Sequence, residues 1–358
     1  MSGSKNRLEW VDTAKGMSII LVVMMYSVFN VGQDAEGIGL WHWVIGFATP
    51  FRMPEFFLIS GLFLSQVIDR PWRAYADRRA VHYLYFYALW AVIHIVLKVG
   101  ILSASPVEAI QLIALSVIEP YGVLWFIYLL AAFSLGTKFF HELRAPKWAV
   151  WIGAAILQMA HIQTGSYLID QFCAYSVYFY SGFIFAGLIF RIVEVAMANK
   201  PLTFALLGLY VVVNALLVFS PGFVFTPHGG EGGLSALPGV RLVLAHAGAL
   251  ALCVTAAMVT GFRVTNWLRW LGEKSIVVYL VFVLPMSFAR IIFGKIGIDD
   301  PTLLSTLVMV TAIVSSVALY LIVQRTGRGK FLFERPAWAH LPGTKGSSSY
   351  KASAVPAE

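Results

Sequence analysis

Apolar runs long enough to cross a membrane recur along the whole chain, and they constrain its fold more than any other feature. An α-helix needs about 20 apolar residues to cross the ~30 Å hydrocarbon core of a bilayer. Because backbone groups in lipid must be hydrogen-bonded within the protein, continuous apolar runs predict helices rather than a barrel. We predict an all-α polytopic membrane protein with about ten transmembrane helices, at residues 14–32, 43–67, 80–101, 107–136, 147–163, 171–192, 202–220, 239–261, 274–294 and 302–323.

The composition leaves no room for a soluble domain, since 59% of the residues are hydrophobic and only 12% are charged. We predict one transmembrane domain over residues 1–324 and a cytoplasmic tail over residues 325–358, first interfacial and then disordered. The first run lacks a short hydrophobic segment with a cleavage site, so we interpret it as a retained span. Glu119 and Gly122 interrupt the fourth run, which allows a re-entrant piece followed by a helix.

Basic residues predict the orientation of the chain in the membrane. The formal net charge is +8, and the Lys and Arg residues concentrate in alternate loops, whereas the other loops carry mainly acidic residues. By the positive-inside rule both termini lie in the cytoplasm. This distribution favours contact with anionic lipid or an anionic cytoplasmic ligand over nucleic acid. Cys173 and Cys253 lie inside apolar runs and have no metal-site spacing, so we expect buried thiols and no metal.

Two charged residues lie deep in the second predicted span, in "TPFRMPEFFLISG" (49–61). Ionisable residues inside a membrane are costly and therefore mark functional sites by default. Arg52 and Glu55 are three residues apart, on one side of a helix that Pro50 and Pro54 bend. They form either an ion pair that ties the bent helix to itself or a pair that points into a water-filled cavity.

The cytoplasmic end of the third span, "RPWRAYADRRAVHYLYFY", carries four arginines. One interpretation is a topology signal; another is a collar that binds phosphate groups, for which the planar arginine fork is well suited. Arg78 and Arg79 are the adjacent pair in this stretch. The lone histidines His94 and His246 are more typical of hydrogen-bonded core residues than of a site.

Lys15 and Tyr26 share one face of the first span. Eleven residues at about 100° each return Tyr26 to within about 20° of Lys15, roughly 16 Å along the helix. One stripe would thus hold a cation at the membrane surface and a hydroxyl near the middle of the bilayer.

Five motifs in order resemble the membrane-bound acyltransferase family 3, whose members acylate surface glycans, lipids and related acceptors. They are "WVDTAKGMSIILVVMMYS", "MPEFFLISGLFL", "DRRAVHYLYFYALW", "LWFIYLL" and "LGEKSIVVYLVFVLP", and the similarity covers roughly residues 7–323. The resemblance implies a bacterial inner-membrane enzyme. Its donor would be acyl-CoA, with acetyl as the expected group, and its acceptor a hydroxyl of an envelope glycan or lipid, as in O-acetylation during polysaccharide modification.

The chain departs from the family pattern at three positions. The family's first-span pattern of a basic residue, ten residues and a histidine reads Lys15, ten residues and Tyr26 here. A second position that is often histidine in relatives is Phe282, and His82 stands where a second arginine is common. The resemblance implies that Lys15 faces the nucleotide phosphates and that Tyr26 lies where the acyl group is transferred. A tyrosine hydroxyl is a poor general base, although it donates well to a developing oxyanion.

Three functions remain open from the sequence. The first is an active acyltransferase in a divergent branch that lacks the usual histidine, with Glu55 as the substitute base, because desolvation strengthens a carboxylate as a base while Arg52 opposes this. The second is a non-catalytic relative that binds or transports a lipid-linked or acylated molecule, and the third is a structural subunit. We predict catalytic roles for Glu55, Tyr26 and Arg52, and donor-binding roles for Lys15, Arg78, Arg79 and Ser60.

Overall fold

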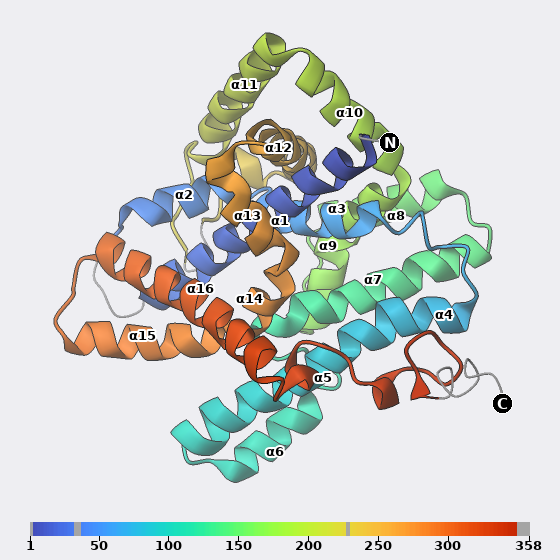
Figure 1. The fold of residues 1–358 in the computed structure, drawn as a ribbon. Coiled ribbons are helices and arrows are strands. Elements are labelled where there is room, and N and C mark those ends of the chain that lie inside the picture. Colours follow the sequence, from blue (N-terminus) through green and yellow to red (C-terminus); the bar gives the residue numbers. More distant parts are fainter. Residues whose placement is uncertain (1–2, 32–36, 227–229, 349–358) are drawn as a thin grey trace.

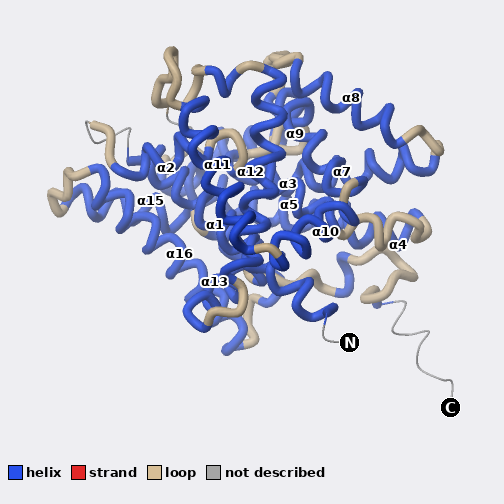
Figure 2. Tube along the Cα trace, turned by 90° about the horizontal axis from the view of Figure 1, so that it is seen from above, coloured by secondary structure: helices blue, strands red, loops and turns tan. Residues whose placement is uncertain are grey.

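The computed structural model describes residues 3–31, 37–226 and 230–348, and all of its long elements are helices (Figures 1 and 2). In chain order the helices are α1 (Gly3–Val31), α2 (Leu40–Ala48), α3 (Arg52–Leu62), α4 (Trp72–Ala76), α5 (His82–Ile95), α6 (Pro106–Leu115), α7 (Trp125–Glu142), α8 (Lys147–Met159), α9 (Tyr167–Ile184), α10 (Ala186–Ala198), α11 (Lys200–Val218), α12 (Pro238–Val259), α13 (Asn266–Glu273), α14 (Ser275–Val281), α15 (Val283–Lys295) and α16 (Pro301–Thr326). The prediction of an all-α membrane fold is confirmed.

The number of spans is smaller than ten by length and composition. Six of the described helices are long and apolar enough to cross a membrane, and the number rises to eight if α9–α10 and α14–α15 each count as one bent span. Proline explains one difference: Pro50 and Pro54 replace the predicted second span by the shorter helices α2 and α3. Pro54 is tolerated in the first turn of α3, where its missing N–H would have no partner within the helix.

The fourth predicted span contains the interruption that the sequence allows. The short helix α6 ends at Leu115, and a turn leads to Gly122, whose φ of +54° suits glycine. The next helix, α7, begins at Trp125 and is long enough to cross the membrane together with the turn before it. Glu119 in the turn accepts hydrogen bonds from the Ser166 hydroxyl and the Leu168 N–H, so it fixes the start of α9 against this turn.

Helix α1 lies in the middle of the bundle and packs against α3, α12, α13 and α16 (Figures 1 and 2). Glycines allow the closest approaches. A Cβ added at Gly272 of α13 would lie 1.7 Å from the Asp12 carbonyl oxygen of α1, and one at Gly16 would lie 2.1 Å from the Leu268 carbonyl oxygen. Small residues at helix interfaces let backbones come together where lipid provides no hydrophobic driving force.

Glycines also allow the close approach of α3 to α9. A Cβ at Gly61 would lie 2.1 Å from the Phe179 carbonyl oxygen, and a Cβ at Gly182 would lie 2.0 Å from the Leu58 carbonyl oxygen. Because α3 begins at Arg52 and α9 carries Tyr175, this contact fixes the two helices that bring these side chains near each other.

We predict that Gly182→Ala lowers the thermal stability of the purified protein, since the new methyl group must push α3 away from α9. The expected cost is about 1–3 kcal/mol, measured by thermal or chemical denaturation in detergent. Gly187→Ala in α10 is the matched control, because a Cβ there meets nothing within 4 Å. Equal stability of the two variants would show that the α3–α9 contact is not tight.

Candidate functional site

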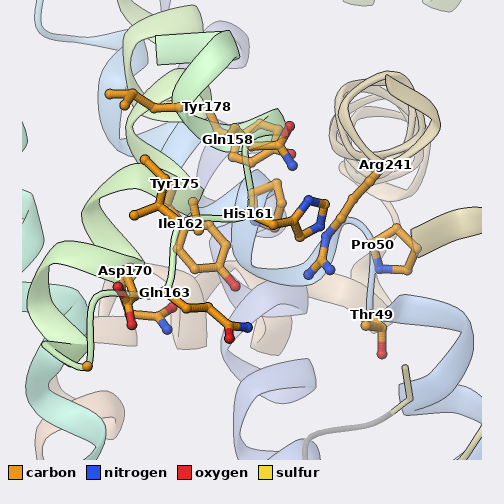
Figure 3. A pocket seen from close by; sticks show the side chains of 15 residues that line it. Thr49, Pro50, Gln158, His161, Ile162, Gln163, Asp170, Tyr175, Tyr178 and Arg241 are labelled. Carbon is orange, nitrogen blue, oxygen red and sulfur yellow. The ribbon is translucent and has the colours of Figure 1, made fainter. Parts of the chain in front are cut away.

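A polar cavity of about 560 Å³ lies where the α2–α3 break, the α8–α9 loop and α12 meet (Figure 3). In Figure 3, Arg241 of α12 reaches into the same space as His161, and the Tyr175 hydroxyl of α9 points into it. The other polar lining side chains are Thr49, Gln158, Gln163, Asp170, Gln171 and Tyr178. We call this space the polar cavity.

The lining of the polar cavity suits a ligand rich in hydroxyl groups. Amide, carboxylate, guanidinium and phenol groups provide both donors and acceptors, and the tyrosine rings add apolar faces. Asp170 is held in place by the backbone N–H and the hydroxyl of Thr164, at 2.7 and 2.9 Å. Among the described residues that line the cavity, His161 is the one imidazole. The sequence analysis missed His161, because its loop position carries no periodic signal.

A buried cluster joins the polar cavity to the centre of the bundle. Arg52 is only 5% exposed, and its charge acts on the hydroxyls of Tyr26 and Tyr175 and on Arg241. The Trp125 indole, a donor only, is the hydrogen-bond partner of the Tyr26 side chain. The Trp125 ring also lies 5.5 Å from the Tyr175 ring, between centroids. Side chains from α1, α3, α7 and α9 therefore come together at one place. We call these four, Tyr26, Arg52, Trp125 and Tyr175, the Tyr26 cluster.

Tyr26 and Phe282, the two positions where the resemblance implies histidine, touch each other. The ring centroids of Tyr26 and Phe282 are 5.5 Å apart. Phe282 lies at the break between α14 and α15 and is fully buried. Tyr279, one turn earlier, donates to the Val123 carbonyl next to α7. On this side the Tyr26 ring therefore has an aromatic neighbour, and the nearby Tyr279 hydroxyl is engaged by a backbone carbonyl.

Glu55 has different surroundings from Arg52. Its carboxylate accepts a hydrogen bond from the Ser18 hydroxyl of α1, and its second oxygen has no hydrogen-bond partner among the described residues. Ser18 precedes Tyr26 by eight residues, which is about 12 Å along the helix axis. The structure therefore brings Arg52 to Tyr26 but places Glu55 two turns away, and neither oxygen of Glu55 lines the polar cavity.

A second cavity, of about 380 Å³, contains the arginine pair of the third motif. Arg78 and Arg79 lie on a π-helical segment, Asp77–Val81, between α4 and α5. Such π-helical insertions are frequent at functional sites. The cavity is also lined by Arg70, His82 and Tyr75, and by three residues of the C-terminal segment, Arg335, His340 and Lys345. We call it the basic cavity.

Two predicted donor-binding residues lie outside the basic cavity. Lys15 is partly exposed beside α13, and its ammonium group lies 3.4 Å from the Asp12 carboxylate, one turn earlier in α1. The Ser60 hydroxyl donates to the Phe56 carbonyl of its own helix at 2.8 Å. Neither is among the described residues that line the polar or the basic cavity.

The lone histidines are hydrogen-bonded core residues, as their pattern predicts. His94 lies 3.0 Å from the Leu280 carbonyl oxygen. His246 contacts the Leu242 carbonyl oxygen through Nδ1 at 2.8 Å, and its Nε2 lies 2.9 Å from the Ser181 hydroxyl. The Trp151 indole donates to the same hydroxyl at 2.8 Å. These contacts satisfy the polar atoms of Ser181 and His246 inside the bundle.

The fold and the two cavities define a multi-pass helical membrane protein with polar groups gathered inside the bundle. Comparison with known proteins identifies the family: residues 8–321 match the Acyl_transf_3 family, described as an acyltransferase domain. The inner membrane protein YcfT of Escherichia coli (strain K12) is 32% identical over 95 residues, which cover 24% of this chain and 27% of YcfT. No solved structure matches the chain significantly. The chain belongs to acyltransferase family 3, and the family supports a membrane acyltransferase role.

Ser18→Ala tests the contact between α1 and Glu55. Loss of the hydroxyl leaves the buried carboxyl group without its partner, so we expect a stability loss of about 1–3 kcal/mol in thermal denaturation. Ser60→Ala is the matched control, since its half-buried hydroxyl bonds only to its own helix and its loss should cost about 0.5 kcal/mol or less. Equal effects of the two substitutions would contradict a role for Ser18 in holding Glu55.

Proposed function

We propose that the protein is an integral membrane O-acyltransferase. It transfers an acetyl or other short acyl group from cytoplasmic acyl-CoA to a hydroxyl of an envelope glycan or lipid, in a bacterial inner membrane with both termini cytoplasmic. The observation that carries the proposal is the Tyr26 cluster. It places the buried Arg52 cation and the Tyr26 hydroxyl next to Tyr175, whose hydroxyl points into a cavity suited to a hydroxyl-rich acceptor.

The two cavities lie toward different parts of α7, as a donor and an acceptor site require. Trp125, at the start of α7, contacts Tyr175 of the polar cavity. The Ser134 backbone carbonyl accepts a hydrogen bond of 2.7 Å from the hydroxyl of Tyr75, which lines the basic cavity. Nine residues separate Trp125 from Ser134, about 14 Å along the helix axis. The polar cavity would take the acceptor, and the basic cavity would take the phosphates of the donor.

In the proposed reaction the acceptor oxygen attacks the thioester carbonyl carbon. A C–O ester bond forms, the C–S bond breaks, and the hydroxyl proton leaves through a base while CoA departs as its thiol. Negative charge develops on the carbonyl oxygen during the attack. The Tyr26 hydroxyl and the Arg52 guanidinium are the groups that would stabilise this charge, and Trp125 would hold the Tyr26 hydroxyl in position.

His161 and Glu55 are the two candidate bases, and the geometry favours His161. The His161 side chain shares the polar cavity with Arg241 and Tyr175 (Figure 3). Histidine is also the side chain that most often serves as a general base. Glu55 lies beside Ser18 and away from the polar cavity, so its contact with α1 supports a structural role.

The non-catalytic alternative rests on the contact between Tyr26 and Phe282. Two aromatic rings occupy the positions where relatives often carry histidine, and they pack against each other. A protein that only binds or transports an acylated or lipid-linked molecule would tolerate aromatic residues in place of these histidines. Purified protein in liposomes would then move such a molecule without consuming acyl-CoA.

Tyr26→Phe tests the proposed transition-state role. Loss of one donor to an oxyanion costs about 10²–10³ in rate, so we expect a loss of that size in transfer of labelled acetyl from acetyl-CoA to base-labile esters in membrane vesicles. Tyr128→Phe is the control, because Tyr128 donates to the Val117 carbonyl, at the turn before α7. A rate of acetyl transfer by Tyr26→Phe equal to that of the wild type would show that the Tyr26 hydroxyl takes no part in the reaction.

The identity of the base is tested by comparing His161→Gln with Glu55→Gln in the same assay. A positioned general base contributes about 10²–10⁴-fold, so His161→Gln should reduce the transfer rate by that amount. Glu55→Gln keeps the size and polarity of the side chain and should retain most of the activity. The reverse result would assign the base to Glu55.

A further inference from the structure

The C-terminal segment, Lys330–Ser347, lies outside the family match, which ends at residue 321, yet it is firmly docked on the bundle. Figure 1 shows it running from the end of α16 past α5 toward α4. The Tyr85 hydroxyl donates to the Phe331 carbonyl at 3.0 Å, and the Trp90 indole donates to the Leu332 carbonyl at 3.1 Å. Two side chains of α5 therefore hold the backbone of this segment.

The segment is anchored next to the arginine pair. Arg335 donates to the Asp77 carboxylate and to the Asp77 carbonyl, both at 2.7 Å, and the Leu341 N–H donates to the second carboxylate oxygen at 2.7 Å. Asp77 and the Arg335 side chain are 1% and 4% exposed. A buried ion pair with additional hydrogen bonds has a defined geometry. The anchor thus fixes the C-terminal segment against the turn that carries Arg78 and Arg79.

Beyond the anchor, a compact turn brings a lysine to the basic cavity. Thr344 donates its N–H and hydroxyl to the Leu341 carbonyl, at 3.1 and 2.7 Å. Gly346 packs so closely on the His340 ring that a Cβ would lie 2.7 Å from it. Lys345, between Thr344 and Gly346 in the chain, is exposed and lines the basic cavity.

The charges around the basic cavity are strongly unbalanced. Its described lining residues include five cations and one carboxylate, that of Asp77, and both carboxylate oxygens of Asp77 are already engaged by the C-terminal segment. The remaining cations, on Arg70, Arg78, Arg79 and Lys345, converge on one space of about 380 Å³. Convergent guanidinium and ammonium groups are the usual recognition elements of phosphate.

We propose that the C-terminal segment completes the donor site, with Lys345 binding a phosphate group of the CoA nucleotide opposite Arg78 and Arg79. This inference rests on the proposed function. The Asp77–Arg335 ion pair holds the segment closed over the phosphates, and Lys345 is a binding residue that the family region lacks.

The test measures CoA binding by isothermal titration calorimetry, with the full-length protein in nanodiscs made of uncharged lipid. Lys345→Ala should weaken CoA binding about tenfold, since it removes one charge-assisted hydrogen bond. Lys345→Arg should bind almost as well as the wild type. Lys330→Ala is the matched control, because Lys330 belongs to the same segment, is exposed and does not line the cavity. Thermal stability should be equal in all four proteins.

Three outcomes would overturn the inference in distinguishable ways. If Lys345→Ala binds CoA like the wild type while Arg79→Ala binds it weakly, the donor site stands without the C-terminal segment. If the wild type does not bind CoA at all, the proposed function fails together with the inference. A second set of nanodiscs contains phosphatidylglycerol; if this lipid competes with CoA and Lys345→Ala loses only the lipid effect, Lys345 binds a lipid headgroup.

Discussion

Direct contact between helix backbones is the constraint on which the rest of the structure depends. In lipid, apolar side chains gain little by leaving the solvent, so helices associate through close packing and interhelical hydrogen bonds. Gly61 and Gly182 bring α3 against α9, and Gly16 and Gly272 bring α13 against α1. These contacts determine the spacing of the helices that carry Tyr26, Arg52 and Tyr175. Glycines, which have no side-chain functional group, therefore position the helices that form the candidate site.

The positions of polar groups inside the bundle are constrained by the need of each buried charge for a compensating neighbour. A buried charge is costly unless other groups compensate it. The Arg52 charge interacts electrostatically with tyrosine hydroxyls next to a polar cavity, and the Glu55 carboxylate accepts a hydrogen bond from the Ser18 hydroxyl. Their helix, α3, begins at the proline break, and Thr49, Pro50 and Pro54 around that break line the cavity. The break in the second span thus forms one wall of the polar cavity, and the helix that begins there carries the Arg52 cation.

The sequence predicted the positions of the long helices better than the contacts between them. Apolar runs identified the long helices, and Glu119 and Gly122 indicated the interruption before α7. The motif order identified the family, and the arginine pair does line a cavity. Helical periodicity assigned Lys15 and Tyr26 to one face, but a face does not specify which helix packs on it. Lys15 pairs within α1, while Tyr26 meets Trp125 of α7 and Phe282 at the α14–α15 break.

The residues that sequence reasoning missed lie where no periodic signal exists. His161 is in a loop, and Ser18 was hidden in an apolar run because a single serine there is ordinary. The final part of the predicted disordered tail, residues 349–358, lies outside the described residues. The segment predicted to be interfacial is held by Asp77 through Arg335 and the neighbouring Leu341. Asp77 is more than 250 residues away along the chain, a separation that local composition cannot reveal.

The contact between Tyr26 and Phe282 has a consequence for any substitution at either position. Because the two rings pack on each other, the residues at these positions are not independent: each shapes the surroundings of the other. Residues in contact show non-additive effects on stability. Substitutions at positions 26 and 282 are therefore coupled, and the role of Tyr26 can be understood only together with Phe282.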